Sequence, residues 1–185
     1  MRLLLPLLLA YSLSACVPGK HLALQDTAVW QATGNANWSY AGKELVGTVR
    51  DGQVGALMTT RSYDNFEFSV DFRPDATVNS GVFVRCATRQ IDMRACYELN
   101  IWDDNPSPPN RTGAVVLRAE PLNQVQTIDR WSTYRVRAEG GRIRAWIDDT
   151  PVADLEDDEL PSGYLGLQAS GTGTIRFRKA RLSEL

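Results

Sequence analysis

Apolar and polar residues alternate along most of the chain, as they do in β-strands that bury one face. In residues 66–73, Phe, Phe, Val and Phe alternate with Glu, Ser, Asp and Arg. The same period of two recurs over 134–139 and 142–147, with Gly140-Gly141 between them. A two-glycine connection between such runs predicts a tight hairpin. No stretch after residue 20 keeps the spacing of an amphipathic helix.

Shorter runs of the same kind fill much of the remaining chain, with turn residues between them at intervals of roughly 8–12 positions. We therefore predict an all-β fold, a two-sheet antiparallel jelly-roll sandwich. The longest irregular piece runs from Asp103 to Gly113, and a loop of that length commonly borders a binding site. The shorter strands are expected at 44–50, 56–60, 80–86, 96–102, 114–119, 151–155, 163–169 and 175–178.

Composition narrows the functional classes. The 185 residues carry a formal charge of −2, so no basic excess is present to hold a nucleic acid. The single histidine, His21, lies near the start of the chain. This argues against Ser–His and Cys–His catalysis and against a histidine-rich zinc site.

The N-terminus has the features of an export signal. Arg2 precedes a leucine-rich run that is too short to span a membrane. The sequence Leu13-Ser14-Ala15-Cys16 then resembles the bacterial lipobox, in which the cysteine is diacylated and becomes the mature N-terminus. On this interpretation residues 1–15 are the signal peptide, 16–27 a lipidated tether and 28–185 the folded domain. Val17 after the cysteine favours the outer membrane of a bacterial cell envelope; an ordinary signal peptide that ends near a cysteine is the alternative.

Lipidation of Cys16 leaves an even pair, Cys86 and Cys96. Disulfides persist in exported proteins, so we expect these two to form one across the ends of two strands. Two buried free thiols are the alternative.

The central pair of strands carries the candidate chemistry. In 97–102, Glu98, Asn100 and Trp102 alternate with apolar residues that point to the core. By the same parity Phe83 and Arg85 of the preceding strand join the face of Glu98. Polar groups beside an aromatic ring suit a sugar, which offers hydroxyls and an apolar face. The alternative is a solvated polar face with a weak Arg–Glu pair.

The expected disulfide conflicts with this parity. If Arg85 and Glu98 lie on the same face of a regular ladder, Cys86 and Cys96 must lie on opposite faces. A β-bulge or an irregular residue near the loop 87–95 would reconcile the two predictions.

Ordered motifs between residues 28 and 185 resemble the 3-keto-disaccharide hydrolase family, whose fold is a concanavalin A-like lectin/glucanase jelly roll. The resemblance implies an enzyme that acts on glycosides oxidised at C3 of the sugar. A base removes the acidified C2 proton, the aglycone leaves C1, and water adds afterwards. The motifs are Asn79-Ser80-Gly81 with Phe83 and Arg85, Tyr97-Glu98 with Asn100, Ile101 and Asp103, Thr112-Gly113-Ala114, Trp131, Gly166-Leu167-Gln168 and Phe177-Arg178.

The resemblance suggests roles for these side chains. Glu98 is the candidate base, Arg85 would stabilise the enolate, and Asp103 would orient Arg85 or protonate the leaving group. Carboxylates of Glu98, Asp103 and Asp104 also suit Ca²⁺ or Mg²⁺, which makes a divalent cation a candidate cofactor. Substrate contacts are expected from Asn79, Phe83, Asn100, Trp102 and Gln168.

Two departures from the family pattern and the absence of a related glucanase motif bear on activity. The family commonly has a histidine two residues after the Leu-Gln pair, whereas here Ser170 stands there. Asn100 replaces the usual glutamine. The glucanase strand motif E-x-D-x-E is also absent, so the two-carboxylate retaining mechanism is not expected. A membrane-anchored protein that binds carbohydrate without cleaving it is therefore the alternative function.

Overall fold

The structure is a computed structural model that describes residues 19–185, and the predicted signal peptide and Cys16 lie outside this part. Among the described residues, no helix is long and apolar enough to cross a membrane. The elements are β1 (Lys20–His21), β2 (Trp30–Gly34), β3 (Asn37–Ala41), β4 (Glu44–Thr59), β5 (Phe66–Pro74), β6 (Val78–Cys86), β7 (Tyr97–Ile101), a short 3-10 helix η1 (Pro108–Asn110), β8 (Ser132–Glu139), β9 (Arg142–Ile147), β10 (Thr150–Glu156) and β11 (Tyr164–Glu184).

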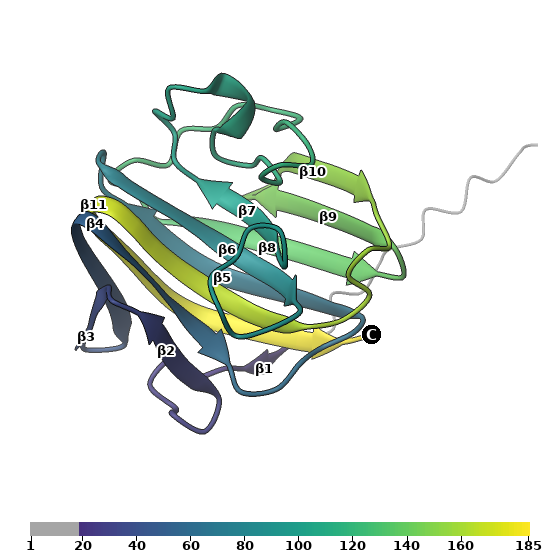
Figure 1. Cartoon of the computed structure of the whole chain (residues 1–185), viewed down its shortest axis with the longest axis horizontal. Helices are drawn as coiled ribbons and strands as arrows, with labels where there is room; N and C mark the ends of the chain where they lie inside the picture. The colour runs from purple at the N-terminus through teal and green to yellow at the C-terminus, as the bar shows by residue number, and fades with distance from the viewer. Residues whose placement is uncertain (1–18) are drawn as a thin grey trace, which may run out of the picture.

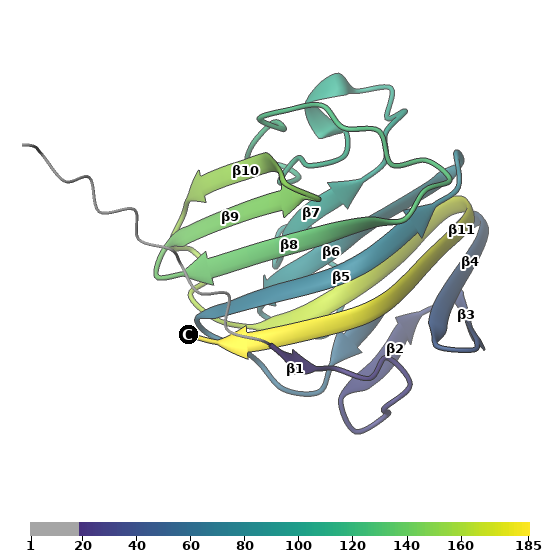
Figure 2. The ribbon, with the colours of Figure 1, turned by 180° about the vertical axis from the view of Figure 1, so that it is seen from behind.

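The strands form two layers because β4 and β11 are long enough to run through both (Figures 1 and 2). The first half of β11 pairs with β6, which pairs with β7, while its second half pairs with β5. We call β2, β6, β7 and the adjoining halves of β4 and β11 the small sheet. The large sheet continues through β5, β8, β9 and β10. All these pairings are antiparallel, so the predicted all-β sandwich is confirmed.

Glycines let the two long strands continue where the sequence predicts turns. Gly171 and Gly173 have φ values of 77° and 106°, and the register between β11 and β4 shifts between them. Gly52, on the facing strand, has φ of 78°. Residues other than glycine rarely adopt this left-handed backbone conformation. The strands predicted at 44–50 and 56–60 are therefore one continuous bent strand, β4. Those predicted at 163–169 and 175–178 likewise form one bent strand, β11.

The core lies between the two layers. Val82, Leu99 and Ile101 of the small sheet and Phe68 and Tyr134 of the large sheet belong to one buried cluster. The parity assigned to β7 is thereby confirmed, because Tyr97, Leu99 and Ile101 all point into this cluster.

Two strand expectations differ from the structure. No strand forms at 114–119, where Val115 makes only isolated bridges with Leu99 and Ala119 and the chain turns at Leu117, whose φ is 66°. Strands β2 and β3 were not among the predicted strands. Their outer positions are mostly exposed, so they lack a clear apolar alternation.

Part of the expected tether packs on the sandwich. β1 pairs with the end of β11, and Leu22 and Leu24 are buried in the main core.

Candidate functional site

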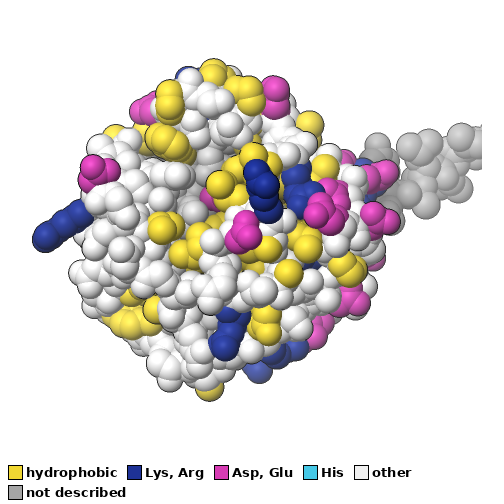
Figure 3. Space-filling view, viewed as in Figure 1, with side chains coloured by type: hydrophobic (Ala, Val, Ile, Leu, Met, Phe, Trp, Pro, Cys, Tyr) yellow, Lys and Arg dark blue, Asp and Glu magenta, His cyan; other side chains and the backbone are white. Residues whose placement is uncertain are grey.

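The outward face of the small sheet collects the candidate residues. Strand register places Glu98 opposite Phe83, and Asn100 opposite Gly81. Gly81 is in turn opposite Gln168 of β11. Figure 3 looks toward this side of the molecule, where hydrophobic side chains lie beside several Lys, Arg, Asp and Glu side chains. Three strands thus bring a carboxylate and two amides together on one face.

Glu98 is the buried ionisable group of this face. Its residue surface is 2% exposed, and its Oε2 atom has no hydrogen-bond partner. Burial raises the pKa of Glu98 to about 7, and the side chain of Gln168 offsets part of that rise. A carboxyl group with this pKa is able to accept and return protons near neutral pH.

Gly81 provides the space that the Glu98 carboxylate occupies. A Cβ atom at Gly81 would lie 3.1 Å from both Cγ and Oε1 of Glu98. The side chain of Glu98 therefore leans across the neighbouring strand toward Gln168. In the sequence Gly81 is only part of a motif, and no pattern there indicates this contact.

Two further acceptors near the carboxylate lack partners. Oε1 of Gln168 and Oδ1 of Asn79 are buried without a hydrogen bond, as is Oε2 of Glu98. Gln168 is opposite Gly81, and Asn79 lies two residues before Gly81 on the same face of β6. Buried polar atoms normally have partners, so these acceptors suit a ligand that donates several hydrogen bonds.

Asn100 and Trp102 lie where β7 meets the long loop. Nδ2 of Asn100 donates to the backbone oxygen of Asn110, which fixes that loop against the strand. Trp102 follows β7 directly, is half-buried, and its backbone N–H donates to Oγ1 of Thr112 at 2.8 Å. The loop from 103 to 113 therefore borders this face, as predicted.

The prediction that Arg85 shares the face of Glu98 is wrong. Arg85 has φ of 52° and is fully buried. Its guanidinium donates to the backbone oxygens of Asp64 at 3.1 Å and Gly140 at 2.6 Å, and to Oδ1 of Asn65. These acceptors lie in two turns beside the large sheet, so Arg85 ties the two layers together.

A β-bulge is the reason for this placement. Between Phe83 and Cys86 strand β6 advances three residues while β11 advances two, from Gly166 to Tyr164. The extra residue reverses the parity, so Cys86 falls on the face of Phe83 and pairs with Cys96. The predicted disulfide is confirmed, and the bulge that allows it removes Arg85 from the site.

Asp103 is also committed elsewhere. Its Oδ1 accepts from the hydroxyls of Thr112 and Thr127, and its Oδ2 accepts from the backbone N–H groups of Thr127 and Ile128. All of its bonds hold two loop segments together, and none reaches Arg85. The expected role of orienting Arg85 is therefore contradicted.

The expected metal ligands do not meet. Asp103 is saturated by the bonds above, and Asp104 is exposed. Within residues 19–185 no group of three or more His, Cys, Asp or Glu side chains is placed to hold a metal ion. The set of Glu98, Asp103 and Asp104 does not fit a divalent cation.

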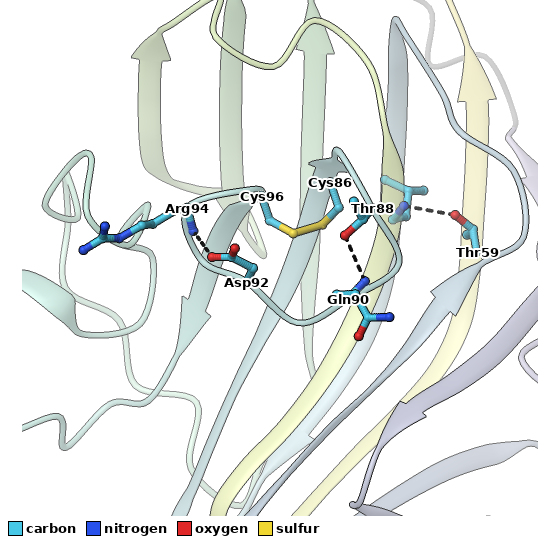
Figure 4. The surroundings of a disulfide bond; sticks show 8 residues. Thr59, Cys86, Thr88, Gln90, Asp92, Arg94 and Cys96 are labelled. Carbon is cyan, nitrogen blue, oxygen red and sulfur yellow. Dashed lines mark hydrogen bonds between the residues drawn. A yellow bond between two sulfur atoms is a disulfide. The ribbon is translucent and has the colours of Figure 1, made fainter.

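Phe83 is on the expected face but is covered. It is fully buried in a small cluster with Ala56, Met58 and the disulfide, and Ile91 of the loop 87–95 packs against this cluster. Figure 4 shows the disulfide closing that loop. The expected contact of Phe83 with a substrate is therefore blocked by the chain itself.

Comparison with known proteins identifies the family. Residues 18–183 match the family model described as a 3-keto-alpha-glucoside-1,2-lyase-like domain. The chain belongs to this family. No curated protein matches the chain. The family places the chain among carbohydrate-active proteins.

Solved structures share the fold at low sequence identity. A candidate glycosyl hydrolase from Parabacteroides distasonis is 23% identical with a TM-score of 0.71, over 84% of this chain and 100% of that chain. The carbohydrate-binding module CBM66 from Bacillus subtilis is 19% identical with a TM-score of 0.64, over 84% and 97%. A Bacillus licheniformis β-glucanase is 12% identical with a TM-score of 0.64, over 92% and 99%. The fold is therefore the concanavalin A-like jelly roll expected from the sequence.

Proposed function

We propose that this protein cleaves glycosides that carry a ketone at C3, and that Glu98 is the base. The observation that carries the proposal is a buried carboxylate with a pKa of about 7 and an unpartnered oxygen, on a face lined by amides. Glu98 takes the proton from C2, and the electron pair of that bond forms the enolate of the C3 ketone. The enolate then expels the aglycone oxygen from C1, which leaves a double bond between C1 and C2.

In this proposal the same carboxyl group returns the proton. Among the described residues, the strand positions of this face hold no carboxylate other than Glu98. A two-carboxylate hydrolysis therefore lacks its second group. Elimination needs only one acid–base residue, because the proton taken from C2 is the one that the leaving oxygen requires. Addition of water to the new double bond would complete hydrolysis.

Amides around Glu98 support sugar binding in this proposal. The free acceptors on Asn79 and Gln168 suit sugar hydroxyls, and half-buried Trp102 offers an aromatic surface at the end of β7. In this proposal Arg85 has no contact with the enolate oxygen, because its guanidinium is bound to Asp64 and Gly140. The histidine common in the family has no part in this scheme.

The test is release of the aglycone from a chromogenic 3-keto-glucoside. We expect kcat/KM to rise with pH and level off above about pH 7, because Glu98 must be ionised to act. Glu98→Gln should lower kcat by roughly 10²–10⁴-fold. Glu120→Gln, at an exposed residue, is the matched control and should keep the wild-type rate. Equal turnover by wild type and Glu98→Gln would refute the assignment.

A carbohydrate-binding protein without activity is the second candidate. The three unpartnered acceptors favour it, because they would bind a sugar whether or not it reacts. A fold shared with a carbohydrate-binding module is compatible with it. Binding of the glycoside with no aglycone release, by wild type and variant alike, would decide for this candidate.

We also propose that a diacyl anchor at Cys16 holds the domain to a bacterial membrane. Val17, directly after the cysteine, favours the outer membrane over the inner membrane. The support is the lipobox-like sequence before Cys16. Two or more acyl chains give the stable attachment that one chain does not. Cys16→Ser should leave the protein in the soluble fraction or as unprocessed precursor. Membrane fractionation like that of wild type would contradict the anchor.

A further inference from the structure

A pocket lies on the outward side of the small sheet, away from Glu98. Its volume is about 370 Å³. It opens between β2 and the loop 87–95, and it is lined chiefly by Gln31, Thr33, Met58, Thr88, Arg89 and Gln90.

The walls of this pocket are held in place without a ligand. The disulfide closes the loop at its base, and Ala87 N–H donates to the oxygen of Ala95 at 2.8 Å. Gln90 N–H donates to Oγ1 of Thr88 at 3.2 Å (Figure 4). Across the opening, Nη1 of Arg89 donates to Oε1 of Gln31. Such fixed walls lower the entropy that the protein must lose when it binds a ligand.

The chemistry of the lining is that of a site for a neutral sugar. Two glutamine amides and two threonine hydroxyls provide donors and acceptors at close quarters. The side chain of Met58 is buried beneath this polar lining. Arg89 is the one charged residue of this lining, and the amide oxygen of Gln31 already accepts from it. Because the positive charge of Arg89 already has a hydrogen-bond partner, the pocket has little preference for an acidic ligand.

The pocket is too far from Glu98 for one sugar ring to fill both sites. Paired positions run from Gln31 through Met58, Gly166 and Phe83 to Glu98, one on each of five neighbouring strands. Four strand spacings amount to about 19 Å. The buried cluster under the loop 87–95 lies between the two ends of this row.

We propose that this pocket is a second carbohydrate-binding site, which takes a neutral sugar unit of a longer glycan. The proposal rests on the proposed function only in that the ligand is a carbohydrate. It makes the disulfide-closed loop a wall of a binding site. It also predicts that the protein engages a glycan at two points, one at Glu98 and one at β2.

The test is calorimetric titration of the full lipidated chain in detergent micelles with four neutral hexasaccharides, built from α-glucose, β-glucose, mannose or galactose. At least one should bind both wild type and Glu98→Gln. Gln31→Ala/Arg89→Ala should weaken that binding about tenfold or more, because each lost hydrogen bond costs about 1 kcal/mol and 1.4 kcal/mol is tenfold. Arg50→Ala/Gln124→Ala changes the same residue types at exposed positions elsewhere and should bind as wild type does.

Three results would overturn the second site. One is no binding of any of the four hexasaccharides. Another is loss of binding in Glu98→Gln, which would assign the sugar to the Glu98 site. The third is wild-type affinity in Gln31→Ala/Arg89→Ala. Because the readout is binding, a failure here is distinct from failure of the proposed reaction, which is scored by aglycone release.

Discussion

Replacing Glu98 by glutamine should stabilise the protein at alkaline pH. The wild-type fold buries a carboxyl group whose pKa rises from 4.5 to about 7, because burial disfavours its charged form. Above pH 7 the folded protein must therefore keep a charge that the unfolded chain hydrates freely. Glutamine has nearly the same shape and carries no charge, so the variant escapes this cost.

The expected size follows from the pKa difference. Each unit of pKa corresponds to about 1.4 kcal/mol, so the cost in wild type is about 3 kcal/mol above pH 7. Because the pKa of Glu98 is raised by folding, its contribution to stability is fully present below about pH 4.5. The contribution is lost as the pH rises through 7. The free energies of unfolding of wild type and variant should diverge over this interval.

Urea denaturation at a series of pH values from 4.5 to 8.5 measures the difference. Glu98→Gln should gain about 3 kcal/mol relative to wild type between the lowest and highest pH, whereas the exposed control Glu120→Gln should show a difference that stays nearly constant. If the free energies of unfolding of wild type and Glu98→Gln differ by the same amount at every pH, the carboxyl group is not buried as described. The raised pKa of Glu98, on which both its stability effect and its role as base depend, would then be wrong.

Three further outcomes are expected. Cys86→Ser should lower the free energy of unfolding by about 3 kcal/mol in denaturation experiments, since it opens a short closed loop; equal stability before and after reduction of wild type would contradict this. Gly81→Ala should lower kcat while circular dichroism stays unchanged, because its Cβ would shift the Glu98 carboxylate by a few tenths of an ångström. Gly141→Ala should keep the wild-type rate. Arg85→Met should destabilise the fold by a few kcal/mol, because the charged hydrogen bonds from the buried guanidinium to three acceptors are lost. The folded variant should keep wild-type kcat, and a large loss of kcat would restore Arg85 to the reaction.

Local patterns were sufficient for much of the site. Alternation in 97–102 placed Glu98 and Asn100 on the outward face, because side-chain parity in a regular strand is fixed by the backbone. The same rule failed one strand away, at Arg85. A single extra residue in β6 reversed parity there, and the sequence contained the conflict between Cys86 and Arg85 but not its outcome.

The sequence by itself determined the all-β class, the strand parity of β7, and the pair of cysteines that forms the disulfide. These follow from short-range rules: the period of two, turn residues and an even cysteine count. Only the tertiary structure decided that Arg85 and Asp103 are structural, that Phe83 is covered and that Gly81 makes room for Glu98. Each depends on contacts between segments distant in sequence, such as Arg85 with Gly140 or Asp103 with Thr127. The pKa of Glu98 is decided in the same way, because burial is a property of the assembled sheet and not of the strand that carries the residue.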